Sequence, residues 1–405
     1  MRALLAVVLC CLGCAAHGAQ GDHHSVSYSI WTVSGPSVLV KILLPVDEAH
    51  RLVGVDVPVL TTKKLGDYVL RHTSVQAGGR DCPAVDQGYD LGRVDPLAVG
   101  PDLYGFELLF RCPSAAALTL NDSVLFERVP EHVNFARVEK AGRSAQQLFT
   151  ADRQRLPVAD SGPLPDAGIG SYIRLGAIHM LHSLDRLCLL LGSLLLIRRG
   201  RDAGFIVAGL IAGYAAALAV TAGDWILPRI TLLEAFIGLL PILLAGLIIL
   251  RELRQPRIAA LGCPAVLLAL AIAAALTHAH WQALMLCGAA LFAAGLLAAS
   301  RESATRRFRW MPWVLPVAVL GFLDGFLLPS LLAPMGVIRW PQLRMVAGFD
   351  SGAAATAALL LGLALAALAL LRRRQLAPPR QAVNEIAAAA LGGCGAFWLL
   401  SRLYS

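Results

Sequence analysis

Eight apolar runs fill the chain from Tyr172 to its end, and they constrain the fold more than any other feature. They span roughly residues 171–197, 203–221, 230–250, 258–277, 282–299, 310–335, 351–371 and 382–401. At 1.5 Å of rise per residue, each run is long enough to cross a hydrocarbon core about 30 Å thick. The whole chain is 57% hydrophobic and only 15% charged, whereas soluble domains are about 25% charged. We therefore expect a polytopic α-helical membrane protein with about eight transmembrane helices.

The arginines predict the orientation of this membrane domain, residues 171–405. Alternate loops between the apolar runs hold fourteen arginines, whereas the loops and tail on the other side hold four. Because loops rich in Lys and Arg stay in the cytoplasm, residues before the first run and the C-terminus are both expected outside. The net charge of +8 thus reflects membrane topology, and we expect no nucleic-acid partner.

The N-terminus reads as a secretory signal over residues 1–18. Met1-Arg2 is followed by an apolar run too short to span a bilayer, and small residues at Ala16 and Gly18 provide a cleavage site. Cys14 ends a segment that faintly resembles a lipoprotein cleavage box, so lipidation there stays open. The signal predicts that the following region is exported to an oxidising compartment.

Residues 19–159 are predicted to form an extracytoplasmic β-sandwich-like domain. Alternating or β-branched stretches separated by Gly, Pro and Asp turns predict strands; these are Val26–Trp31, Val38–Leu44, Leu52–Leu60, Tyr104–Phe110 and Leu118–Phe126. Cys82 and Cys112 are the cysteines of this region. Their spacing lacks a CxxC metal pattern, so a disulfide is the preferred interpretation. A Gly- and Pro-containing linker follows at 160–170.

Ionisable residues inside the apolar runs are the candidate functional residues, because each costs about 2.5–3.5 kcal/mol to insert. On a single helical wheel for the first run, His179, His182 and Arg186 form one stripe, with Asp185 about 100° from Arg186. Asp324 in the sixth run lies at similar depth, so it is expected to form an intramembrane ion pair with Arg186. The prolines around it predict a kinked or partly unwound helix. Nearer the predicted outer ends lie further carboxylates that read either as part of a cation path or as wetted interface groups, among them Glu234 and Asp350.

The first run, residues 173–187, resembles the hydrogenase/urease accessory (HupE/UreJ) family. Members read approximately GxxHIxxGxDHLLF at this point, after an exported β-rich domain of similar size. Three further segments fit family motifs approximated as VEALIALS, FGLLHGLGFA and FNLGVELGQ; they are residues 232–238, 320–325 and 348–352. The resemblance implies a bacterial inner-membrane protein that handles nickel or a similar divalent ion through intramembrane His and carboxylate ligands, which suit that metal.

Three residues match the implied ligands, namely His179, Asp185 and Glu234. Other positions depart from the family pattern: Arg186 stands where a second histidine belongs, Asp324 replaces the histidine of FGLLHG, and Gly213 or Tyr214 replaces the histidine of the second run. An Arg–Asp pair in the central cavity would fill it through charge-assisted hydrogen bonds. The departures predict a degenerate metal site, with His182 as a replacement ligand that Arg186 would oppose.

Three functions remain open from the sequence. The first is a divalent-metal permease or metal-linked accessory protein with an ion pathway at His179, His182, Asp185, Glu234 and Asp324. The second is a metal-independent membrane scaffold whose β-rich domain binds an extracytoplasmic protein partner. The third is coupling to protons or another small ion through the carboxylates. No nucleophile elbow, phosphate loop or HExxH motif is present, so we do not expect an enzyme.

Overall fold

The computed structural model describes most of the chain from Ser25 to Tyr404. The described residues are 25–46, 48–49, 61–94, 103–160, 164, 166–197, 200–223, 228–251, 256–276, 280–302, 311–335, 340–375 and 379–404. The predicted signal peptide and the predicted strand at Leu52–Leu60 lie outside these ranges. The described chain forms two units. One is β-rich and holds residues up to Ser171 together with 331–337, and the other, the membrane unit, holds the remaining residues from Tyr172 onward.

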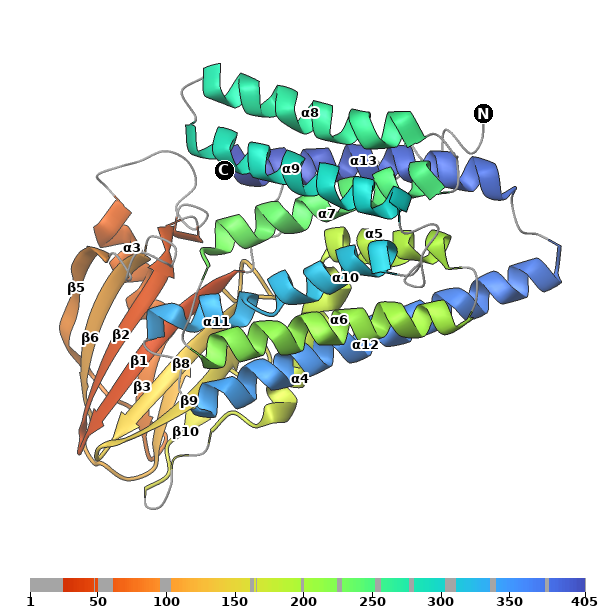
Figure 1. Cartoon of the computed structure of the whole chain (residues 1–405). Helices are drawn as coiled ribbons and strands as arrows, with labels where there is room; N and C mark the ends of the chain where they lie inside the picture. Colours follow the sequence, from red (N-terminus) through yellow and green to blue (C-terminus); the bar gives the residue numbers. More distant parts are fainter. Residues whose placement is uncertain are drawn as a thin grey trace. The chain divides into compact units, whose positions relative to one another are not determined.

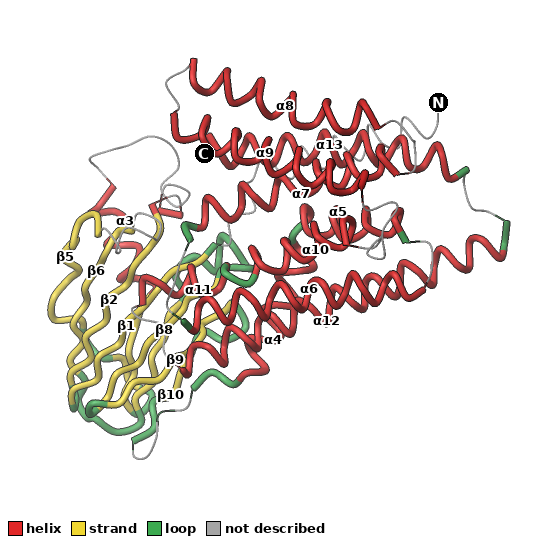
Figure 2. The backbone as a smooth tube through the Cα atoms, viewed as in Figure 1, coloured by secondary structure: helices red, strands yellow, loops and turns green. Residues whose placement is uncertain are grey.

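The β-rich unit contains two sheets (Figures 1 and 2). The larger has the strand order β5-β6-β2-β1-β8-β9 and the smaller β10-β7-β3-β4. Their bounds are β1 Val26–Ser34, β2 Ser37–Pro45, β3 Thr73–Ala77, β4 Arg80–Asp81, β5 Ala84–Val94, β6 Leu103–Arg111, β7 Leu118–Asp122, β8 Val133–Lys140, β9 Arg143–Thr150 and β10 Arg155–Pro157, with helix α3 at Thr61–His72. β1 pairs antiparallel with β2 and parallel with β8.

Alternation along the strands explains why the two sheets share one core. Trp31 and Phe106 of the larger sheet belong to the same buried apolar cluster as Val75 and Leu120 of the smaller one. Such period-two burial places every second side chain on the inner face. Cys82 and Cys112 are joined by a disulfide at this core, which is the pairing that the sequence favours. The predicted strand at Leu118–Phe126 ends at Asp122, after which the chain turns.

The membrane unit consists of helices that follow the eight apolar runs (Figure 1). Their bounds are α4 Ile169–His182, α5 Leu184–Ser193, α6 Gly200–Ala222, α7 Ile230–Arg251, α8 Pro256–Leu276, α9 His280–Glu302, α10 Met311–Asp324, α11 Leu327–Leu332, α12 Trp340–Arg373 and α13 Arg380–Tyr404. Within the described ranges, six spans are long and apolar enough to cross a membrane, or up to seven if one bent pair counts as a span. The described apolar part of α8, Gly262–Leu276, is shorter.

The single straight helix predicted at 171–197 is wrong. The chain bends by 75° between α4 and α5, because Ser183 adopts an extended backbone with φ −83° and ψ 96°. The carbonyl oxygen of His179 accepts from both the hydroxyl (2.8 Å) and the backbone N–H (3.1 Å) of Ser183, so Ser183 closes the last turn of α4. The sixth run is interrupted as well, at Gly325–Phe326 between α10 and α11.

Glycines bring two pairs of helices into backbone contact. A Cβ on Gly213 of α6 would overlap the carbonyl oxygen of Ala318, and a Cβ on Gly321 of α10 would overlap that of Leu210. Helices α4 and α12 are in similarly close contact. A Cβ on Gly352 of α12 would overlap the carbonyl oxygen of Ile173 of α4. Small residues allow such close approach between membrane helices. The polar side chains next to these glycines are therefore held near each other.

Candidate functional site

The two helix breaks carry the ionisable side chains of the first and sixth runs. His179 lies in the last turn of α4, Asp185 and Arg186 lie in the first turn of α5, and Asp324 is the last residue of α10. Asp185 accepts a hydrogen bond from the backbone N–H of Arg186 (2.7 Å), and a carboxylate is favourable at the N-terminus of a helix. The breaks thus place the charged side chains at helix ends.

Asp324 is the centre of the site. Its Oδ1 accepts a hydrogen bond from Arg186 Nε (2.6 Å) and lies 3.2 Å from His179 Nε2, while its Oδ2 accepts from the Tyr214 hydroxyl (2.7 Å). The Asp324 side chain is fully buried. The structure therefore places Arg186 and Asp324 in direct contact, as expected from their matching depth.

Asp185 extends the site to a second arginine. Its Oδ1 lies 3.3 Å from Arg186 Nη1, and its Oδ2 accepts a hydrogen bond from Arg402 Nη1 (2.8 Å). The same Arg402 nitrogen donates to the backbone carbonyl oxygen of Glu234 (2.9 Å). We call the six side chains that make these contacts the polar network: His179, Asp185, Arg186, Tyr214, Asp324 and Arg402. Each is 7% exposed or less.

Charge is balanced within the polar network. Two carboxylates face two guanidinium groups, and each carboxylate has a guanidinium donor at hydrogen-bond distance. Burying charges is costly unless each is paired and hydrogen-bonded. The arrangement meets that condition with groups of the chain itself.

Two of the five predicted metal-ligating residues, His182 and Glu234, are not among the six side chains of the polar network. His182 is exposed, and its Nδ1 bonds to the carbonyl oxygen of Ile178 (2.9 Å). The predicted stripe of His179, His182 and Arg186 is wrong because the bend at Ser183 ends the helix before Arg186. Asp185, expected far from Arg186 on that wheel, contacts it. Glu234 is buried, and its backbone carbonyl oxygen accepts a hydrogen bond from Arg402 of the polar network.

The sequence interpretation missed Arg402 and gave Tyr214 no contact role. Arg402 was counted with the outer tail because it follows the last apolar run, yet α13 continues to Tyr404 and buries it. A possible signal was the lone arginine in an otherwise apolar last turn. Asp350, left open as a wetted interface group, is only 5% exposed.

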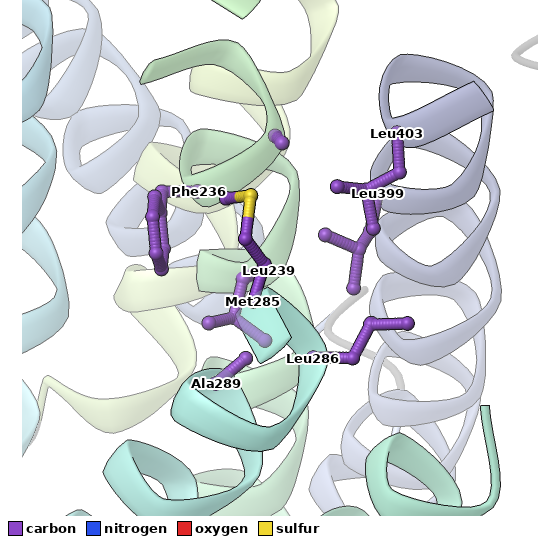
Figure 3. A pocket seen from close by; sticks show the side chains of 8 residues that line it. Phe236, Leu239, Met285, Leu286, Ala289, Leu399 and Leu403 are labelled. Atoms are coloured by element: carbon purple, nitrogen blue, oxygen red, sulfur yellow. The ribbon is translucent and has the colours of Figure 1, made fainter. Parts of the chain in front are cut away.

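An apolar pocket lies elsewhere in the membrane unit, between α7, α9 and α13 (Figure 3). Its lining is entirely apolar and includes Phe236, Met285 and Leu399. Such a lining offers no ligand for an ion. Among the residues that the structure describes, no group of three or more His, Cys, Asp or Glu side chains is arranged to hold a metal ion.

Comparison with known proteins identifies the class of the membrane unit. Residues 158–279 match a protein-family model described as HupE / UreJ protein. The match covers less than a third of the chain and agrees with the motif resemblance, and together with the apolar helices it indicates a membrane protein. The matched segment contains His179, Asp185 and Arg186, whereas Asp324, Asp350 and Arg402 follow it. A search of curated proteins gave no match.

Proposed function

We propose that this chain is a metal-linked accessory membrane protein of HupE/UreJ type whose central site is degenerate, closed by ion pairs in place of a bound metal ion. The match of residues 158–279 to the HupE / UreJ model supports the accessory role. The bond from Arg186 Nε to Asp324 Oδ1 (2.6 Å) is the observation that carries the second part. The Asp324 carboxylate, which a divalent ion would need as a ligand, is thus already bound to a permanent cation.

Electrostatics supports closure of the site. Arg186 and Arg402 both lie against the carboxylates, and arginine stays protonated in proteins. A divalent ion entering here would meet two fixed positive charges, and displacing either guanidinium would leave a buried charge without its partner. Breaking a buried pair in this way costs about 3–5 kcal/mol. We therefore propose that the resting protein does not hold a metal ion at the polar network.

The test replaces Arg186 with the residue type that the family pattern has there. Purified full-length protein and the variants Arg186→His and Arg174→His are titrated with Ni²⁺ by calorimetry, and bound metal is measured by elemental analysis. Arg174 is exposed on α4 and provides the matched control. We expect stoichiometric binding only in Arg186→His. Stoichiometric Ni²⁺ in the unmodified protein that is lost in Asp324→Asn would overturn the proposal.

A metal permease remains a second candidate, favoured by the two broken spans. Interrupted helices that present free backbone groups near the middle of the bilayer are typical of transport sites, and α4/α5 and α10/α11 are both interrupted. Transport would require an open state in which Asp324 leaves Arg186. Ni²⁺ uptake by proteoliposomes that is abolished in Asp324→Asn supports this candidate, and absence of uptake excludes it.

We also propose a location and a non-enzymatic role for the β-rich unit. The arginine distribution supports insertion in the bacterial inner membrane with the β-rich unit and the C-terminus outside. There the unit would bind an extracytoplasmic protein as a scaffold, and we propose no catalytic activity. Labelling of single cysteines introduced at Ser114 and Ser401 by a membrane-impermeant reagent in intact cells should reach both positions; protection of either one contradicts the orientation.

A further inference from the structure

Asp350 is a buried carboxyl group without a hydrogen-bond partner. It lies on α12, its residue is 5% exposed, and neither Oδ1 nor Oδ2 contacts a donor in the described part of the chain. Buried polar groups in proteins are almost always hydrogen-bonded, so an exception calls for an explanation. The motif resemblance gave Asp350 no ligand role, and the proposed function does not use it.

Packing places Asp350 beside the polar network. The ring of its neighbour Phe349 lies 5.3 Å from the ring of His179, and backbone contact at Gly176 and Gly352 joins α12 to α4. Asp324 and Tyr214 interact electrostatically with Asp350. The charged or titratable side chains buried on these surrounding helices are Tyr172 and His179 on α4, Asp185 and Arg186 on α5, Asp202 and Tyr214 on α6, and Asp324 on α10.

The surrounding cations are already committed to other carboxylates. Arg186 donates to Asp324, and Arg402 donates to Asp185. An ionised Asp350 would add a third carboxylate charge beside two carboxylates that already face the two guanidinium groups, and it would gain no donor. An isolated carboxylate in an apolar interior is far more costly than a neutral acid, and the usual relief is to take up a proton.

We propose that Asp350 is a proton-binding site of the membrane unit, and that release of its proton weakens the closed polar network. Uptake converts the carboxylate and a hydronium ion into a carboxylic acid and water, so no other reactant is needed. In the ionised form, Asp350 repels Asp324 and competes for the hydroxyl hydrogen of Tyr214. The network is then less stable with the proton absent than with the proton present.

This inference does not depend on the metal content of the protein, so it is tested with metal-free full-length chain in nanodiscs. Infrared difference spectra across a pH titration detect the carbonyl band of protonated carboxylic acids. The spectra are recorded in an Asp122→Asn background, because burial in the β-rich unit raises the pKa of Asp122 to about 7. We expect one band at neutral pH that disappears in Asp350→Asn and persists in the control Glu385→Gln, which changes an exposed carboxylate of α13.

Thermal unfolding supplies the second readout. The unfolding temperature should fall as pH rises from about 4, the pKa of an exposed aspartate, toward the pH at which the band disappears, and it should level off above that pH. This fall should be absent in Asp350→Asn. If that variant does not fold, Asp350→Glu retains the acid and should shift the frequency of the same band. Absence of any band that responds to substitution of Asp350 would show an ionised carboxylate and overturn the proposal. A band with no accompanying change in unfolding would overturn the link to the polar network.

Discussion

The two units bury polar groups in opposite ways. In the β-rich unit, Ser27 and Asn134 bond to each other, and the His132 ring lies between the hydroxyls of Ser25 (2.7 Å) and Ser27 (2.8 Å). All of these groups are buried, and none needs a charge. The membrane unit instead buries two carboxylates with two guanidiniums. Neutral groups bond through orientation alone, whereas buried charges require a fixed partner of opposite sign.

In the β-rich unit, burial also favours the neutral forms of the titratable side chains. Burial lowers the pKa of His132 from 6.5 to about 3, which keeps the imidazole neutral, with one ring nitrogen able to donate and the other to accept. Burial also raises the pKa of Asp122 from 3.8 to about 7, against the opposing effect of the Val124 N–H bond. Each of these two buried groups therefore makes the stability of this unit depend on pH, and the two dependences have opposite signs.

The largest effect is expected from breaking one charge pair of the polar network. Asp324→Leu leaves Arg186 buried without its main partner and should cost about 3–5 kcal/mol of unfolding free energy. The double variant Arg186→Met with Asp324→Leu removes both charges and should recover most of that loss. Denaturant unfolding of full-length protein in detergent measures both.

The matched control for this experiment is an ion pair at the surface of the β-rich unit. Glu127 and Arg128 are both more than half exposed, so Glu127→Gln should cause no measurable change, as solvent screens such pairs. If the double variant Arg186→Met with Asp324→Leu is as unstable as Asp324→Leu alone, the charge-pair account is contradicted.

A smaller effect is expected from the glycine contacts that hold the polar network together. Gly352→Ala forces α12 away from α4, and overpacking of this kind costs about 1–3 kcal/mol. Gly362→Ala on the same helix meets no atom within 4 Å and should be neutral or stabilising by up to about 1 kcal/mol, because alanine favours helix. Thermal unfolding of the two variants, read side by side, gives the comparison. Equal unfolding temperatures would show that the close approach is not required.

The smallest effect expected in the unmodified protein is a slope with pH in the β-rich unit, where two buried groups oppose each other. Stability from His132 is lost as pH falls from about 6.5 toward 3, and stability from Asp122 is lost as pH rises from about 4 toward 7. The two slopes oppose each other between about pH 4 and 6.5, each near 1.4 kcal/mol per pH unit. Asp122→Asn should leave stability rising with pH, and His132→Gln should leave it falling.

Hydrogen exchange of the slowest amides in β1, β7 and β8 measures these slopes in the full-length chain, after correction for intrinsic exchange rates. The unmodified protein, with both groups present, should be nearly flat over the same pH interval. Slopes of the same sign in the two variants would refute the assigned protonation states.

The sequence was sufficient to predict which segments are apolar and which alternate. Hydrophobic run length and period-two patterning are local properties, so the membrane segments and the strands β1, β2 and β6 follow from composition and spacing. The cysteine pair was accessible for the same reason, since few cysteines lie in the polar region. Predicting the ion pair of Arg186 and Asp324 also required the premise that both residues lie at equal depth in the bilayer.

Which charged residues contact each other could be seen only in the folded chain. The bend at Ser183 separated Arg186 from the stripe that holds His179 and His182, because one residue in an extended conformation resets the direction of every side chain after it. The burial of Arg402 against Asp185 joins residues 217 positions apart, a contact that no local pattern encodes. Reading the chain alone is enough to show that charges lie inside the apolar segments. Helix packing, through backbone contact at glycines, determined which of them meet, because a buried charge is stable only where a partner from another segment reaches it.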